Sequence, residues 1–491
     1  MKFNRYHAFL ISIILIGMVL FFYVFTKVGV SSFTHDESYT YLNYPHDSFT
    51  EIISFSNWFT NNHILNTLFI KYSEKLFGNS ELALRLPNLI LLLVYMFYSY
   101  RLFIDKNHLL GIAMFLLLGT NVLLMDLFGL ARGYGLSFGF MLMSMYHFME
   151  YLKGRKTLHI ILFHLAALLA SLSSFTLLTF YAAMLLVYNV LLYIDVRIMK
   201  SEKFRFFQLN KVHLIPLLLV FVILYEPLRR LLTYNDLNFG GKQGFYADTV
   251  SELIFNTFHY TPISPSVLLI LQIIFTLIIL ISFVIIVRSV IQRKREFFNQ
   301  YIGLIISNFL LIILSVIIIL QHIILKTDYP IGRFSVFLFP LFIIHLGFFI
   351  HYLIVTGYKK TSLITISLVA LISAISFYDK ADFSSSAEWT YDSKTKNMIQ
   401  TLTTYRELNH DKSKNIKLGI NWVFEPTINY YIKRYEIDWL LPADREGISV
   451  SDDYFYIFKD DFNKLQLSDY EIIKEYNEIN TLLIKNNTGK E

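Results

Sequence analysis

Long apolar runs, separated by short polar stretches, fill the first three quarters of the chain. Most of these runs are close to the 20 residues that an α-helix needs to cross the ~30 Å hydrocarbon core of a bilayer. The pattern predicts eleven transmembrane helices, at residues 8–28, 83–103, 109–125, 133–150, 158–173, 175–194, 213–226, 265–287, 301–325, 334–355 and 361–377. We therefore expect an α-helical polytopic membrane protein.

Three polar segments are long enough to fold outside the bilayer. They are a first loop at 29–82, a middle loop at 227–264 and a C-terminal tail at 379–491. The tail alternates short strand-like runs with a helical stretch, which predicts a small α/β domain. We expect a membrane domain over 1–378 and a soluble domain over 379–491. The middle loop is either a mobile lid over a substrate site or a plain connection.

The charge distribution predicts which side each loop faces. Residues 1–378 hold 28 basic and 17 acidic residues, within a chain whose formal net charge is +6. If the N-terminus is cytoplasmic, 18 of those 28 basic residues lie in short cytoplasmic loops, which is the positive-inside pattern. The basic surplus thus indicates orientation, and no nucleic-acid partner is expected. The odd number of spans places the tail outside. The alternative of a cleaved signal peptide is disfavoured because the first apolar run exceeds the usual h-region of about 7–15 residues.

The composition agrees with a membrane protein. Hydrophobic residues make up 55% of the chain and charged residues 16%, whereas an average soluble domain carries roughly 25% charged residues. The absence of cysteine excludes disulfides, thiolate metal sites and cysteine nucleophiles.

Residue types that carry chemistry gather in the first loop and at the ends of predicted spans. The first loop opens with FTHDESYTY at 33–41, continues through Asn62 and His63, and ends in LFGNSELALRLP at 76–87. DLFGLARGYGL at 126–136 precedes the fourth span, and DYPIGRF at 328–334 precedes the tenth. Taken singly, a loop acid is usually solvated, and an arginine at a helix end is commonly an interfacial anchor.

Together these patches resemble the GT-C membrane glycosyltransferases, in particular the bacterial relatives of the dolichyl-phosphate-mannose protein mannosyltransferases and of the aminoarabinose transferase of lipid A (family 39). Those proteins carry an Asp-Glu motif in the first extracytoplasmic loop and an LFG(D/N)SE-x-ALRLP stretch entering the second span, which residues 76–87 match almost letter for letter. The chain departs from the family at Asn62-His63-Ile64, where two prolines are missing. It also departs at Leu130, where the family has an acid and Asp126 is the nearby carboxylate.

The resemblance implies a GT-C fold and an inverting glycosyltransferase in a bacterial inner membrane. Such an enzyme moves a sugar from a polyprenyl-phosphate-linked donor to a cell-envelope acceptor, which is a glycan, a lipid or a protein, on the extracytoplasmic face. It needs a base for the acceptor hydroxyl and cations for the departing phosphate. The resemblance makes Asp36 and Asp126 the catalytic candidates. It makes Glu37, His63, Arg85, Arg132, Tyr134 and Arg333 the substrate-binding candidates. A divalent cation, Mg²⁺ or Mn²⁺, is left open, with Asp36, Glu37 and Asp126 as its ligands.

Two other functions stay open at this point. A transporter or lipid flippase would show repeated halves and acids near the middle of its spans, and neither is visible in the sequence. An inactive protein that binds sugar-lipids is suggested by Leu130 and the missing prolines. Arg85 is equally consistent with a structural role beside Pro87. His63 has no spaced partner, and such a histidine is more often not a metal ligand.

Overall fold

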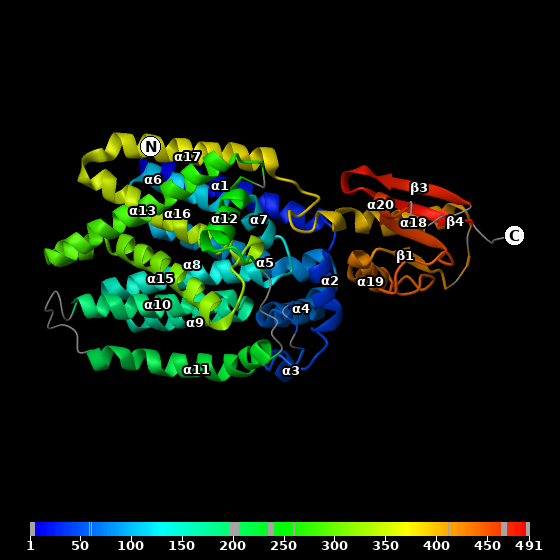
Figure 1. The fold of residues 1–491 in the computed structure, drawn as a ribbon, viewed down its shortest axis with the longest axis horizontal. Coiled ribbons are helices and arrows are strands. Elements are labelled where there is room, and N and C mark those ends of the chain that lie inside the picture. The colour runs from blue at the N-terminus through cyan, green and yellow to red at the C-terminus, as the bar shows by residue number, and fades with distance from the viewer. Residues whose placement is uncertain are drawn as a thin grey trace.

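The computed structural model describes residues 5–57, 59, 61–195, 206–233, 240–258, 261–410, 412–413, 415–462 and 469–487. Within these residues the apolar runs form helices that lie side by side in an elongated bundle (Figure 1). The C-terminal domain lies against one end of this bundle, next to the short helices of the first loop. The arrangement agrees with the expectation that the first loop and the tail share one side of the membrane.

The bundle and its connecting loops are built from helices of very different length. The long elements are α1 (Arg5–Val30), α5 (Glu81–Phe103), α8 (Gly133–Gly154), α9 (Thr157–Ser173), α10 (Thr176–Tyr193), α11 (Phe206–Thr233), α13 (Pro265–Ile291), α15 (Ile302–Leu325), α16 (Leu338–Leu353) and α17 (Lys359–Lys380). The shorter elements are α2 (His35–Asn43), α3 (Phe49–Ile53), α4 (Ile64–Phe77), α6 (His108–Gly119), α7 (Val122–Phe128), η2 (Phe245–Val250), α12 (Ser251–Thr257), α14 (Arg295–Gln300), η3 (Gly332–Phe334) and η4 (Ile354–Tyr358).

Six helices among the described residues are long and apolar enough to cross a membrane, counting Leu338–Lys380 as one. The span expected at 109–125 is instead broken: α6 and α7 meet at an angle of 68°. The break has a local cause, because the Asn121 side chain accepts a hydrogen bond from the Leu124 N–H and starts a new helix at Val122. The run expected at 213–226 lies within the longer α11. The total of eleven crossings stays a prediction.

The tail forms the small α/β domain that the sequence predicts. Its four strands are β1 (Leu418–Ile420), β2 (Tyr454–Phe458), β3 (Tyr470–Tyr476) and β4 (Thr481–Asn486), in the order β1-β2-β4-β3. β1 and β2 are parallel, with Leu418 opposite Tyr454, and the other pairs are antiparallel. Helical segments flank the sheet: η5 (Thr390–Lys394), α18 (Thr395–Leu408), η6 (Trp422–Phe424), α19 (Glu425–Arg434), α20 (Lys459–Phe462) and η7 (Asn477–Ile479).

The tail and the first loop share one hydrophobic core, so packing continues across the boundary expected at residue 378. Phe33 and Tyr41 of the loop are buried in the same cluster as Tyr430 and Tyr431 of α19. The rings of Phe33 and Tyr430 stack with centroids 4.2 Å apart. The Tyr431 hydroxyl accepts a hydrogen bond from the Phe33 N–H at 2.8 Å. These contacts fix the position of the residues just after Phe33, where the acidic motif begins.

Candidate active site

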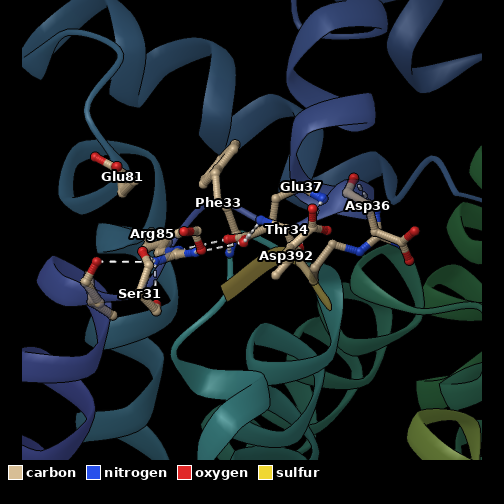
Figure 2. A network of polar contacts seen from close by, with 12 residues as sticks. Ser31, Phe33, Thr34, Asp36, Glu37, Glu81, Arg85 and Asp392 are labelled. Atoms are coloured by element: carbon tan, nitrogen blue, oxygen red, sulfur yellow. Dashed lines mark hydrogen bonds and ion pairs between the residues drawn. The ribbon is translucent and has the colours of Figure 1, made fainter. Parts of the chain in front are cut away.

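The acidic motif forms the first turn of α2. Thr34 caps this helix, and a reciprocal pair of hydrogen bonds joins the Thr34 and Glu37 side chains to each other's backbone N–H groups. Successive residues of a helix are rotated by about 100°, so the adjacent Asp36 and Glu37 side chains point to different surroundings. Figure 2 shows Arg85 and Asp36 on opposite sides of the network, with Glu37 between them.

Glu37 is paired with Arg85 in the protein interior. Arg85 Nε and Nη2 donate to the two oxygens of the Glu37 carboxylate, each at 2.7 Å, and both side chains have 0% exposure. Glu37 Oε1 also accepts from the Ala131 N–H at 2.6 Å. Arg85 Nη1 donates to the Val28 carbonyl and to the Ser31 hydroxyl.

This pair connects segments that are far apart in the sequence. It joins the end of α1, the start of α2, the start of α5 and the turn before Arg132. The sequence resemblance placed Glu37 and Arg85 among the substrate contacts, and the structure differs. Their polar groups are occupied by the protein itself, so the geometry gives them a structural role.

Asp36 faces two arginines that come from distant parts of the chain. Its Oδ2 atom lies 3.6 Å from Arg132 Nη2 and 3.4 Å from Arg333 Nη2. Both separations exceed the usual length of an N–H···O hydrogen bond. Asp36 keeps 16% exposure, whereas Glu37 keeps none. The structure therefore brings together the three charged residues that the sequence singled out for proton transfer and phosphate binding.

Arg132 is held from its other edge. It lies immediately before α8, and its Nη1 donates to the Thr40 hydroxyl at 2.7 Å and to the Asn61 carbonyl at 2.8 Å. The guanidinium is 1% exposed. Arg132 Nη2 makes no hydrogen bond with the described residues. This edge of the guanidinium faces Asp36, so its N–H groups are available to a ligand.

Arg333 is held by the tail and by Tyr134. Glu388 accepts from its backbone N–H at 2.7 Å and from Nη1 at 2.5 Å. The Tyr134 hydroxyl accepts from Nε at 3.1 Å, and the guanidinium lies over the Trp389 ring at 4.9 Å. Burial lowers the pKa of Arg333, but Tyr134, Asp36 and Glu388 outweigh burial and raise the pKa above its usual value. The side chain is 27% exposed and stays a cation.

Two tail acids complete the site and were missed by the sequence analysis. Glu388 approaches so closely that a Cβ at Gly332 (φ +50°) would lie 2.7 Å from its Oε1. Asp392 accepts from the His35 N–H at 2.6 Å and so fixes the start of α2. Burial raises the pKa of Asp392 well above its usual value. Neither acid lies in a recognisable motif, so no sequence signal marks them.

His63 and Tyr134 lie beside the two arginines. Their rings meet edge to face with centroids 4.9 Å apart. Burial, and then the charges of Arg132 and Arg333, lower the pKa of His63 well below its usual value. The imidazole is therefore neutral at pH 7. Its Nε2 is buried and has no hydrogen-bond partner among the described residues.

Asp126 is buried and paired with a lysine, whereas the catalytic role expected of it requires an accessible carboxylate. It is 2% exposed and forms a buried ion pair with Lys27 of α1. Its second oxygen accepts from the Ala387 N–H at 3.1 Å. The acid thus ties α7 to α1 and to the start of the tail. The geometry opposes the expectation that Asp126 replaces the second-loop acid of the family.

The carboxylates suggested as metal ligands do not converge. Glu37 is bound to Arg85, Asp126 to Lys27, and Asp36 faces Arg132 and Arg333. Within the part of the chain that the structure describes, no group of three or more His, Asp or Glu side chains is arranged to hold a metal ion. A Mg²⁺ or Mn²⁺ site built from Asp36, Glu37 and Asp126 does not fit this arrangement.

The site combines one partly exposed carboxylate with two guanidinium groups whose Nη2 edges face it. A carboxylate accepts a proton, and a guanidinium fork binds phosphate oxygens with two parallel hydrogen bonds. The two arginines are anchored by hydrogen bonds to Thr40, Asn61 and Glu388, so their positions are largely set before a ligand arrives. The arrangement is suited to a reaction in which a hydroxyl loses its proton while a phosphate gains charge.

Comparisons with known proteins agree with this description of the fold. No protein-family model matches the sequence, and no curated protein matches it. The chain is similar to the crystal structure of ArnT from Cupriavidus metallidurans in the apo state, with a TM-score of 0.54 and 10% identity over 98% of both chains. It is also similar to the same protein bound to undecaprenyl phosphate, with a TM-score of 0.53 and 9% identity over 98% of both chains. The oligosaccharyltransferase of Archaeoglobus fulgidus gives a TM-score of 0.44 at 10% identity, over 92% of this chain and 69% of that one. The chain therefore has the fold of ArnT, which agrees with the fold that the sequence resemblance predicts.

Proposed function

We propose that this protein is an inverting glycosyltransferase. It takes a sugar from a polyprenyl-phosphate-linked donor and transfers it to a hydroxyl of a cell-envelope glycan, lipid or protein. The reaction takes place on the extracytoplasmic face of a bacterial inner membrane. The observation that supports this proposal most directly is the convergence of Arg132 and Arg333 on the Asp36 carboxylate. The likeness to ArnT, solved with undecaprenyl phosphate, supports the class of donor.

The proposed reaction is a direct displacement at the anomeric carbon. Asp36 takes the proton of the acceptor hydroxyl while the acceptor oxygen forms its bond to the anomeric carbon. The bond between that carbon and the phosphate oxygen breaks, and the electron pair leaves with the polyprenyl phosphate. Arg132 and Arg333 stabilise the charge that develops on this leaving group. The steps as written use these three side chains and no metal ion.

The loose contacts of Asp36 explain how one cluster serves both roles. At 3.4 and 3.6 Å, the two Nη2 groups attract Asp36 without hydrogen-bonding to it. A donor phosphate has oxygens that accept these N–H groups at hydrogen-bond length. When the phosphate binds, the arginines turn their donors to it, and the Asp36 carboxylate is left free to accept a proton.

The experiment that tests the proposal uses Asp36→Asn, which keeps the shape of the side chain and removes the base. A deletion strain is complemented with the wild-type protein, with Asp36→Asn, or with Asp379→Asn, an acid 67% exposed at the end of α17. Envelope glycans are compared by mass spectrometry. We expect the wild type and Asp379→Asn to restore the missing sugar, and Asp36→Asn to reduce it by roughly 10²- to 10⁴-fold, the usual contribution of a general base.

Two results would contradict the proposal. Full restoration of the envelope glycans by Asp36→Asn would show that Asp36 is not the base. Unchanged envelope glycans in the deletion strain would argue against transferase activity. Expression and the melting temperature of Asp36→Asn in detergent are measured in parallel, because the comparison requires folded protein.

A further inference from the structure

A pocket lies at the end of the bundle opposite to Asp36. The helix α5 connects the two places, because it carries Arg85 near the proposed active site and Arg101 in the pocket lining. The 16 residues of helix between them span about 24 Å. Likewise α8 begins next to Arg132 and carries Lys153 in its last turn. Chemically informative residues of the pocket lining are Arg101, Asp105, Lys106, Glu150, Lys153 and His351. The pocket is therefore separate from the proposed glycosyltransferase site.

Two cations of this pocket lack a carboxylate partner. Lys106 is half-buried, and no carboxylate oxygen of the described residues lies within 4.0 Å of its ammonium group. Burial, and then the charge of Lys153, lower the pKa of Lys106. Arg101 Nη2 donates to the Tyr146 hydroxyl at 2.5 Å. Its guanidinium likewise forms no ion pair with a described acid.

The acids of the lining act on these cations from beyond ion-pair distance: Asp105 favours the charged form of both, and Glu150 that of Arg101. Glu150 is used by Lys153, whose Nζ donates to it at 2.7 Å. Asp105 is exposed and forms no ion pair with the described residues of the pocket. Lys106 is half-buried and gains no ion pair with the described residues, so part of its lost hydration is not replaced. The pocket lining holds three cations, Arg101, Lys106 and Lys153, against the two acids Asp105 and Glu150, which leaves a surplus of one positive charge.

The rest of the lining has the character of a site for an amphiphile. His351 contributes a buried Nδ1 that has no hydrogen-bond partner among the described residues. The lining also includes the apolar residues Leu102, Met149, Leu304 and Phe348, all buried. Charged and apolar groups in one lining match a molecule with a charged head and a hydrocarbon body.

We propose that this pocket binds the phosphate group of a membrane lipid, held by Arg101 and Lys106. Phosphate supplies the missing negative charge, and its oxygens accept the free N–H donors of the guanidinium and the ammonium group. The pocket lies among the basic loops at one end of the bundle. The lipid head groups of one leaflet lie at the level of such loops. Free inorganic phosphate offers the same chemistry, and the experiment distinguishes the two sources.

The test uses Lys106→Gln, because no hydrogen bond or ion pair with the described residues is lost when this ammonium is removed. The control is Lys360→Gln, which removes one exposed cation beside η4, outside the pocket lining. The full chain in detergent is incubated with phosphatidylglycerol, with diacylglycerol, which has no phosphate, or with inorganic phosphate alone. Bound lipid is measured by native mass spectrometry and stabilisation by thermal melting.

We expect wild type and Lys360→Gln to retain phosphatidylglycerol and not diacylglycerol. Lys106→Gln should weaken retention by roughly tenfold or more, the value of one charge-assisted contact. Equal retention of phosphatidylglycerol by Lys106→Gln and Lys360→Gln would contradict the proposed lipid site. Stabilisation by inorganic phosphate that matches phosphatidylglycerol would overturn the lipid as its source. Should Lys106→Gln not fold, Arg101→Gln takes its place, with its melting temperature measured first.

Discussion

Replacing Glu37 with Gln should destabilise the protein far more than replacing its neighbour Asp36 with Asn. The two changes are chemically alike, since each replaces a carboxylate with an amide of nearly the same shape. Their surroundings differ. The Glu37 carboxylate accepts two 2.7 Å hydrogen bonds from Arg85 at 0% exposure. Asp36 is 16% exposed and lies 3.4 and 3.6 Å from its arginines.

The magnitude follows from these contacts. In Glu37→Gln the amide presents one acceptor and one N–H₂ group to a guanidinium that needs two acceptors, and Arg85 is left buried without a counter-charge. Breaking a buried ion pair from one side costs about 3–5 kcal/mol. Asp36→Asn breaks two contacts that exceed hydrogen-bond length, and Arg333 keeps its ion pair with Glu388. The buried Arg132 loses its neighbouring carboxylate but keeps its hydrogen bonds, so the cost is about 1–2 kcal/mol. The two variants should therefore differ in unfolding free energy by about 1–4 kcal/mol.

The assay is thermal and denaturant unfolding of the two purified variants in one detergent, followed by the restoration of envelope glycans in cells. Glu37→Gln should melt well below wild type, and Asp36→Asn should melt closer to wild type and be inactive. Glu37→Leu combined with Arg85→Met should recover part of the lost stability, because no unpaired charge is left buried. Equal stability of Glu37→Gln and Asp36→Asn would refute the reasoning that burial separates their roles.

Two further predictions concern the neighbouring charged groups. Asp126→Asn and Lys27→Met should each lower stability by about 3–5 kcal/mol, whereas the double variant Lys27→Met/Asp126→Leu should regain part of it and still restore the envelope glycans; a folded but inactive double variant would return Asp126 to the catalytic candidates. Stability should also fall as the pH drops below about 6.5, because the unfolded chain protonates His63 there and the folded protein, with the lowered pKa of His63, does not. The loss attributable to His63 is at most about 1.4 kcal/mol per pH unit. Melting measured between pH 5 and 8 should therefore be less steep in His63→Gln, and identical slopes would contradict the assignment.

The sequence by itself determined the class of the protein and the chemistry available to it. The length of its apolar runs requires helices that cross a bilayer, because only such helices satisfy their backbone in hydrocarbon. The motifs around Asp36, Arg132 and Arg333 marked residues at the ends of these runs, where charge meets the membrane surface. The alternation of the tail predicted its α/β character, which the four-stranded sheet confirms.

The tertiary structure alone decided what each charged residue does. Asp36 and Glu37 are neighbours in the chain, and only the tertiary structure buries Glu37 against Arg85 of α5. Asp126 lies six residues from Arg132, yet its partner is Lys27, 99 positions away. Glu388 reaches Arg333, 55 positions away, where its neighbours Ala387 and Trp389 pack into the core of the bundle. The sequence pattern records local periodicity, whereas the pairing of buried charges depends on which helix ends meet in space.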